Sequence, residues 1–78
     1  MRRKEKRLVI AFYTTHDAMA FEEFCQAEGI PGRLIPLPRE ISAGCGLAWS
    51  ADPDKEEDYK RCLSEAGINA QHMLIIEV

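Results

Sequence analysis

The sequence contains no long apolar run. A helix that crosses a membrane needs roughly 18 apolar residues, and the apolar segment Leu8–Phe12 is far shorter. Polar residues follow this segment, where a secretory signal peptide would have its cleavage site. We therefore expect no membrane partner and a cytoplasmic location.

Cysteine is scarce and forms no close pair in the sequence. The three cysteines, Cys25, Cys45 and Cys62, are odd in number and widely spaced, which argues against the disulfide framework of a small secreted domain. A reducing compartment explains them more simply. The absence of a Cys-x-x-Cys motif also makes a copper-chaperone site a poor interpretation.

Motifs for metals, phosphates and nucleic acids are missing too. His16 and His72 lie too far apart in the sequence to suggest zinc spacing, and neither standard glycine-rich phosphate motif occurs. The aromatic signature of RNA-binding strands is absent. After residue 7 the chain has twelve acidic and five basic residues, which argues against a nucleic-acid partner. We therefore expect no metal site and no cofactor.

The length predicts one small domain preceded by a basic arm. Residues 1–7 carry five basic residues and one acidic residue, which is typical of a solvated, flexible chain end. We assign residues 8–78 to a single domain. A chain of 78 residues buries only a thin core and has little room for a deep substrate cavity. A carrier, adaptor or sensor therefore fits the size better than a metabolic enzyme.

Hydrophobic periodicity predicts four strands and two helices. Thr14 begins a Thr-x-x-Asp capping pattern, and Gly29 follows as a stop signal, so the first helix should cover residues 15–28. Asp52 and Pro53 mark the start of the second helix, which ends at Gly67. The strands are predicted over residues 8–13, 32–37, 47–50 and 72–78.

The element order β-α-β-β-α-β predicts an α+β fold. Two similar βαβ halves in a chain of this length point to a ferredoxin-like two-layer sandwich. Right-handed crossovers then give an antiparallel sheet in the order 4-1-3-2, with both helices on one face. The prolines near the end of the second strand predict that it lies at an edge.

Cys45 is the residue that this topology makes chemically interesting. It lies between Gly44 and Gly46, which bring no side chains and should leave its sulfur exposed. The predicted fold places the loop between strands two and three beside the start of the first helix, where free N–H groups favour a thiolate. The residues brought to this end of the sheet should be Thr14, Thr15 and His16, with Arg39 as a further candidate cation.

Each of these residues also has a structural interpretation. A cysteine in a glycine-rich turn can simply fill space, and His16 can be an ordinary surface residue. Cys25 and Cys62 fall on apolar helix stripes, which predicts small buried hydrophobic side chains. Trp49 fits core or edge packing better than a stacking platform. Arginines at positions 33 and 39 can serve only to discourage pairing at a sheet edge.

Two segments resemble a known family. They are Thr-Thr-His-Asp-Ala at residues 14–18, with Glu22, and the segment Gly-Ile-Pro-Gly-Arg-Leu-Ile-Pro-x-Pro-Arg-x-Ile-Ser-x-Gly-Cys-Gly at residues 29–46. Both are similar to the putative selenium/sulfur carrier protein-like family of small bacterial proteins. The resemblance implies that Cys45 is the carrier cysteine. It also implies that its motif neighbours are Arg39, Ser42, Gly44 and Gly46.

The leading hypothesis is a carrier that holds sulfane sulfur or selenium on Cys45 as a persulfide or perselenide. The donor would be a cysteine desulfurase or a similar persulfide-bearing enzyme, and the acceptor an enzyme that uses selenium or sulfur. On this hypothesis a carrier fits the chain better than an enzyme does, and the sequence leaves the question of enzymatic activity open.

Two alternatives stay open. One is a regulatory or protein-interaction module that binds a small ligand or a partner through the loop 38–46, with a homodimer as one form of such a partner. The other is a redox-sensing thiol, although the loop contains no resolving cysteine.

Overall fold

A computed structural model describes residues 5–78 of the chain. Its element order is the predicted β-α-β-β-α-β, with one additional short 3-10 turn. The strands are β1 (Lys6–Phe12), β2 (Arg33–Pro36), β3 (Leu47–Ala51) and β4 (Ala70–Glu77), and the helices are α1 (Thr15–Ala27) and α2 (Glu56–Ala66). The domain is α+β, with a four-stranded antiparallel sheet and two helices.

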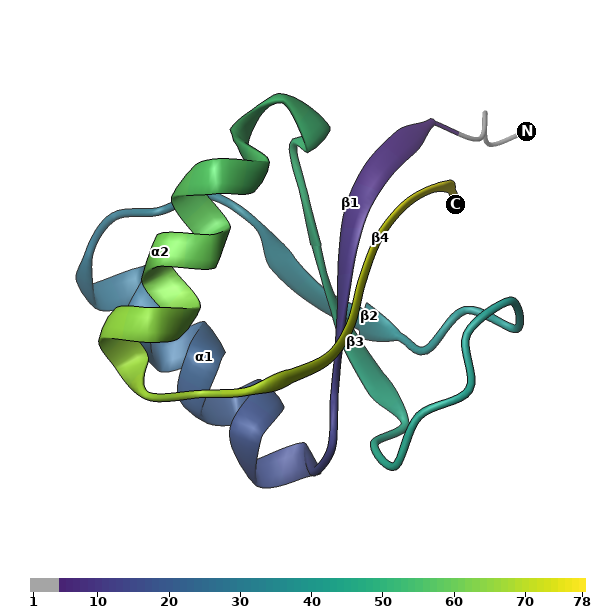
Figure 1. Cartoon of the computed structure of the whole chain (residues 1–78), viewed down its shortest axis with the longest axis horizontal. Coiled ribbons are helices and arrows are strands. Elements are labelled where there is room, and N and C mark those ends of the chain that lie inside the picture. The colour runs from purple at the N-terminus through teal and green to yellow at the C-terminus, as the bar shows by residue number, and fades with distance from the viewer. Residues whose placement is uncertain (1–4) are drawn as a thin grey trace.

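The strand order is β2-β3-β1-β4, which is the predicted 4-1-3-2 order read from the opposite edge. Strand β1 pairs along most of its length with β4 and β3, while within the described part of the chain β2 pairs only with β3. Both helices lie on one side of the sheet, and the loop between β2 and β3 lies on the other (Figure 1).

The strand boundaries differ from the predicted ones mainly at the two long strands. Strand β1 begins at Lys6, so Lys6 and Arg7 belong to the sheet and not to the predicted arm. Arg7 is half-buried because its Nε donates a hydrogen bond to Ser50 Oγ at 3.1 Å. The rest of the predicted arm that precedes residue 5 lies outside the described residues. Strand β4 begins at Ala70, two residues earlier than predicted.

The ends of both helices agree with the predicted ones, except at the start of the second helix. Thr14 caps α1, because its Oγ1 accepts a hydrogen bond from the N–H of Asp17 at 3.1 Å. Gly67 ends α2 in the left-handed conformation that favours glycine. Asp52 does cap a helical segment, but that segment is the 3-10 turn Pro53–Lys55, and α2 itself begins only at Glu56.

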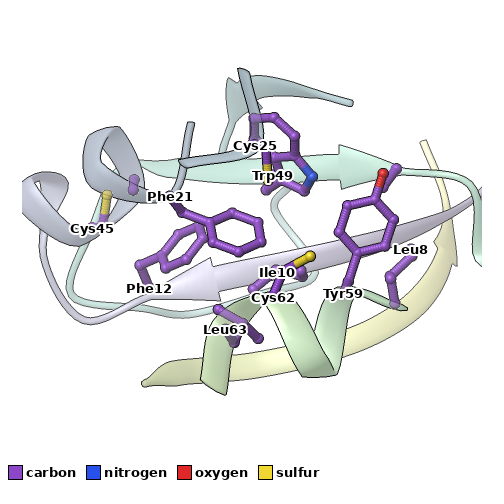
Figure 2. Packing of buried hydrophobic residues seen from close by; sticks show 12 residues of the cluster. Leu8, Ile10, Phe12, Phe21, Cys25, Cys45, Trp49, Tyr59, Cys62 and Leu63 are labelled. Atoms are coloured by element: carbon purple, nitrogen blue, oxygen red, sulfur yellow. The ribbon is translucent and has the colours of Figure 1, made fainter. Parts of the chain in front are cut away.

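The main core lies between the sheet and the helices. Phe21 of α1 packs between Phe12 and Trp49, with ring centroids 5.6 and 5.4 Å away. Cys25 and Cys62 are buried in the same cluster, as predicted, and so is Trp49. Figure 2 shows Cys45 at one end of this cluster and Tyr59 at the other.

A second, smaller cluster covers the opposite face of the sheet. It consists of Val9 and Ala11 of β1 and Ala48 of β3, closed over by Ile41 from the loop between β2 and β3. The loop therefore serves as the cover of this face. It then passes to the helix side, because Cys45 belongs to the main core.

Candidate functional site

The candidate site is the end of the sheet where the loop 38–46 meets the start of α1. One backbone hydrogen bond forms a turn inside the loop, and a second joins the two ends of the loop. The N–H of Ile41 donates to the carbonyl of Pro38 at 3.0 Å, and the N–H of Leu37 donates to the carbonyl of Gly46 at 2.9 Å. The bond between Leu37 and Gly46 continues the pairing of β2 and β3 up to the turn that contains Cys45.

The Cys45 side chain is buried, and the prediction of an exposed sulfur is wrong. The residue is only 2% exposed and belongs to the main core cluster. The reason lies in the close packing of the turn at Gly44. A side chain there would place its Cβ 2.4 Å from the carbonyl oxygen of Tyr13, so Gly44 lets the loop pack closely against the chain after β1.

The sulfur of Cys45 has two polar neighbours. The N–H of Leu47 donates to Sγ at 3.2 Å, and the Sγ–H of Cys45 donates to the hydroxyl oxygen of Thr15 at 3.6 Å. Thr15 is the first residue of α1, so the sulfur lies at the N-terminal turn of the helix. An N–H donor of this kind stabilises a sulfur that carries negative charge, and the Thr15 hydroxyl can donate to the sulfur once the thiol has lost its proton.

The other predicted site residues are placed less closely. The hydroxyl of Thr14 caps α1 by accepting the hydrogen bond from Asp17. The side chain of His16 is 91% exposed, and its nearest charged partner is Asp17 at 3.9 Å. No hydrogen bond described for residues 5–78 joins Cys45 to His16, Arg39 or Ser42. The side chain of His16 therefore points into solvent, and its position beside the sulfur stays a prediction.

Two residues of β4 hold the loop, and the sequence interpretation missed both. Gln71 Oε1 accepts a hydrogen bond from the N–H of Gly44 at 3.0 Å. His72 Nε2 lies 2.9 Å from the carbonyl oxygen of Ser42, which fits donation from that ring nitrogen. The predicted topology could have indicated these two residues. Strand β4 is antiparallel to β1, so the first residues of β4 lie at the same end of the sheet as the loop.

Gly46 differs from Gly44 in the space that a side chain would have. A Cβ at position 46 would meet nothing within 4 Å, and the backbone there does not adopt a positive φ. The geometry therefore requires glycine at position 44 and leaves position 46 sterically free. Of the two flanking glycines, only Gly44 has a packing role.

The two other thiols differ in environment from Cys45. Burial raises the pKa of Cys25 from 9.0 to about 12, and the nearby Cys62 adds to the effect. Burial also raises the pKa of Cys62, with Glu65 as the next contribution. Both thiols are buried in the main core cluster. The hydrogen bonds from Leu47 and to Thr15 involve the sulfur of Cys45 and neither of these thiols.

Within residues 5–78, no three histidine, cysteine or acidic side chains are grouped so that they could hold a metal ion. No helix in that part of the chain is long and apolar enough to cross a membrane.

Comparison with known families assigns the chain. A model of the family described as "Putative Se/S carrier protein-like" matches residues 7–74. The chain belongs to this family. The match includes β1 from its second residue, α1, the whole loop with Cys45 and the first residues of β4. The search of curated proteins found no match, and neither did the search of solved structures.

Proposed function

We propose that the protein carries sulfane sulfur or selenium on Cys45 and passes it to an acceptor protein. The observation that supports this most directly is the setting of the sulfur, between the N–H of Leu47 and the hydroxyl of Thr15 at the start of α1. Membership of the carrier-like family supports it independently. We also group the domain with ferredoxin-like sandwiches, on its element order and sheet.

The loading step conserves atoms and electrons. The Cys45 thiolate attacks the terminal sulfur of a donor persulfide, such as that of a cysteine desulfurase. A new S–S bond forms at Cys45, the donor S–S bond breaks, and the donor leaves as its thiolate. The terminal sulfur keeps its oxidation state throughout. A perselenide follows the same scheme with selenium as the transferred atom.

The release step is the reverse of loading with another partner. A nucleophile of the acceptor enzyme attacks the terminal atom, and Cys45 leaves as a thiolate. The N–H of Leu47 and the hydroxyl of Thr15 are placed to stabilise the charge that returns to Sγ. The chain's own contribution is therefore to hold the sulfur and stabilise its anion.

Burial of Cys45 adds a requirement to this function. A sulfur that is 2% exposed cannot be reached by a second protein in the closed loop. We propose that the turn around Cys45 opens during transfer. Gly44 and Gly46 on either side are exposed, so a small displacement of the turn brings the sulfur to the surface.

The test is loading followed by intact-mass measurement. The protein is incubated with a cysteine desulfurase and cysteine, and we expect the wild-type chain to gain the mass of one sulfur atom. Cys45→Ser should gain none, while the control Cys25→Ala should load as the wild type does. A wild-type chain that never gains sulfur, or equal loading of the Cys45→Ser variant, would contradict the proposal.

The same burial favours a second candidate, a regulatory or interaction module without covalent chemistry. In that case Cys45 is a packing residue, and the loop 38–46 binds a ligand or partner. Thiol alkylation separates the two functions. The carrier requires Cys45 to react faster than Cys25 and Cys62 in the folded protein, whereas the module predicts that all three react only as fast as the protein unfolds.

A further inference from the structure

Strand β4 is a long, uncovered edge of the sheet. It spans eight residues, Ala70–Glu77, and among residues 5–78 it pairs only with β1, so no other described strand occupies its outer side (Figure 1). Unpaired strand edges offer rows of N–H and C=O groups to other chains. Proteins usually protect such edges with proline, lysine or short strands, and β4 contains none of these.

The other edge of the sheet shows the contrast. Strand β2 is four residues long and ends at Pro36, and Pro38 follows two residues later. Proline has no N–H to give to a new neighbour. The chain therefore protects the β2 edge and leaves the β4 edge available for pairing.

The backbone of β4 shows which groups point outward. Glu5 and Val78 exchange both of their backbone hydrogen bonds, at 3.2 and 3.0 Å. Pairing with β1 continues without a shift from there to His72. Because the pattern alternates along an antiparallel pair, Leu74 and Ile76 also direct their polar groups toward β1. The N–H and C=O groups of Met73, Ile75 and Glu77 therefore point away from the sheet.

The side chains along this edge are apolar although they are accessible to solvent. Leu74 is 42% exposed and Ile75 is 47% exposed. Between residues 70 and 76 the strand carries no acidic, lysine or arginine side chain. Exposure of such a surface to water is unfavourable, and the free energy falls when another apolar strand covers it.

We propose that β4 pairs antiparallel with β4 of a second copy of this chain, about a two-fold axis at Ile75. Pairing of identical strands about a two-fold axis is necessarily self-complementary. With the axis at Ile75, this residue lies opposite its own copy, and Met73 lies opposite Glu77. All three outward-facing residues of each chain are then paired.

Charge and side-chain pairing agree with this register. The one carboxylate of β4, on Glu77, lies opposite Met73 of the second copy and not opposite its own equivalent, so no like charges face each other. Leu74 lies opposite Ile76, which adds an apolar pair on the face away from the helices. The two four-stranded sheets then form one continuous eight-stranded sheet.

The first test combines the oligomeric state with amide hydrogen exchange on the full chain. Sedimentation equilibrium between about 10 μM and 1 mM should show a monomer–dimer equilibrium. In the same range, exchange at the amides of Met73, Ile75 and Glu77 should slow as concentration rises. The amides of Leu74 and Ile76, already bonded to β1, should not change. A chain that stays monomeric, or protection without this alternation, would overturn the proposal.

The second test uses a matched pair of charge substitutions. Ile75→Lys places two like charges opposite each other at the two-fold axis and should weaken dimerisation at least about 10-fold. Met19→Lys on α1 introduces the same charge at a side chain of similar exposure, 54%, and should leave the dimer unchanged. Circular dichroism confirms that both variants fold. Equal effects of the two substitutions, or none from Ile75→Lys, would show that β4 is not the interface.

Discussion

Gly44 donates its backbone N–H to the side-chain oxygen of Gln71 at 3.0 Å. This bond joins the turn that contains Cys45 to the first residues of β4, 27 positions later in the sequence. The contact between His72 Nε2 and the carbonyl of Ser42 lies on the next residue of the strand. Strand β4 therefore sets how firmly the loop closes over the sulfur.

Removal of the Gln71 side chain should loosen the loop without unfolding the domain. Gln71→Ala deletes the acceptor for the Gly44 N–H, and one such hydrogen bond is worth about 0.5–1.5 kcal/mol. We expect Cys45 to be alkylated about 2- to 10-fold faster in the native protein. Alkylation of Cys25 and Cys62 reports global unfolding and should change less.

Gln71→Glu is the control for that experiment, because its carboxylate still accepts from Gly44. Its Cys45 should react at close to the wild-type rate. Peptide mapping after a timed reaction with iodoacetamide measures the three thiols separately. If Gln71→Ala accelerates all three equally, the bond supports overall stability and does not hold the loop in particular.

The two glycines beside Cys45 provide a second prediction. A Cβ at position 44 would lie 2.4 Å from the Tyr13 carbonyl oxygen, whereas a Cβ at position 46 meets nothing within 4 Å. Gly44→Ala should therefore lower the free energy of unfolding by about 1–3 kcal/mol, and Gly46→Ala should change it by no more than about 0.5 kcal/mol. Urea denaturation measures both. Equal losses would show that the turn does not depend on this close approach.

The sequence predicted the helices and strands around this site better than the burial of Cys45 within it. Helix α1 carries its own start and stop signals in Thr14 and Gly29, and the strand patterns led to the correct element order. These features are local, so the neighbouring residues determine them. The position of Thr15 near Cys45 followed from the topology alone, because the order of strands decides which ends meet.

The burial of Cys45 could not be predicted in this way. It depends on contacts between the turn and residues far along the chain, namely the Tyr13 carbonyl and the Gln71 side chain. Glycines beside a cysteine are compatible both with an open turn and with a closely packed one. Only the three-dimensional arrangement distinguishes them, and here it selects the closely packed turn.

The buried thiol of Cys25 predicts a loss of stability at alkaline pH. Its pKa in the folded protein is about 12, raised from 9.0 mainly by burial. Below pH 9.0 both the folded and the unfolded chain keep the proton, so the full stability is present. Above this value the unfolded chain loses its proton first, and the free energy of unfolding falls until the pH passes about 12.

This thiol alone should contribute a slope of up to about 1.4 kcal/mol per pH unit within that window. Cys25→Ala removes the titrating group, so its stability should fall less steeply between the same pH values, although it starts from a lower level. Urea denaturation over a pH series measures both slopes. Parallel curves for the two proteins would show that Cys25 does not keep its proton in the folded state.

The Thr15 hydroxyl provides the most direct test of the carrier chemistry. Its oxygen lies 3.6 Å from Cys45 Sγ at the first residue of α1, where it can donate to a sulfur that carries negative charge. Thr15→Val keeps the branched shape but removes the hydroxyl. A hydrogen bond to a charged group is worth about 1.5–3 kcal/mol, so sulfur loading onto Cys45 at fixed pH should slow about 10-fold or more. Thr15→Ser keeps the donor and should load at close to the wild-type rate.

The measurement is the initial rate of persulfide formation by intact mass, with the unfolding free energy of each variant determined in parallel. Both variants retain the helix cap, because Thr14 provides it, so large differences in stability are not expected. If Thr15→Val and Thr15→Ser slow loading equally, the hydroxyl has no part in the reaction. Stabilisation of the sulfur would then come from the Leu47 N–H, the other polar group in contact with it.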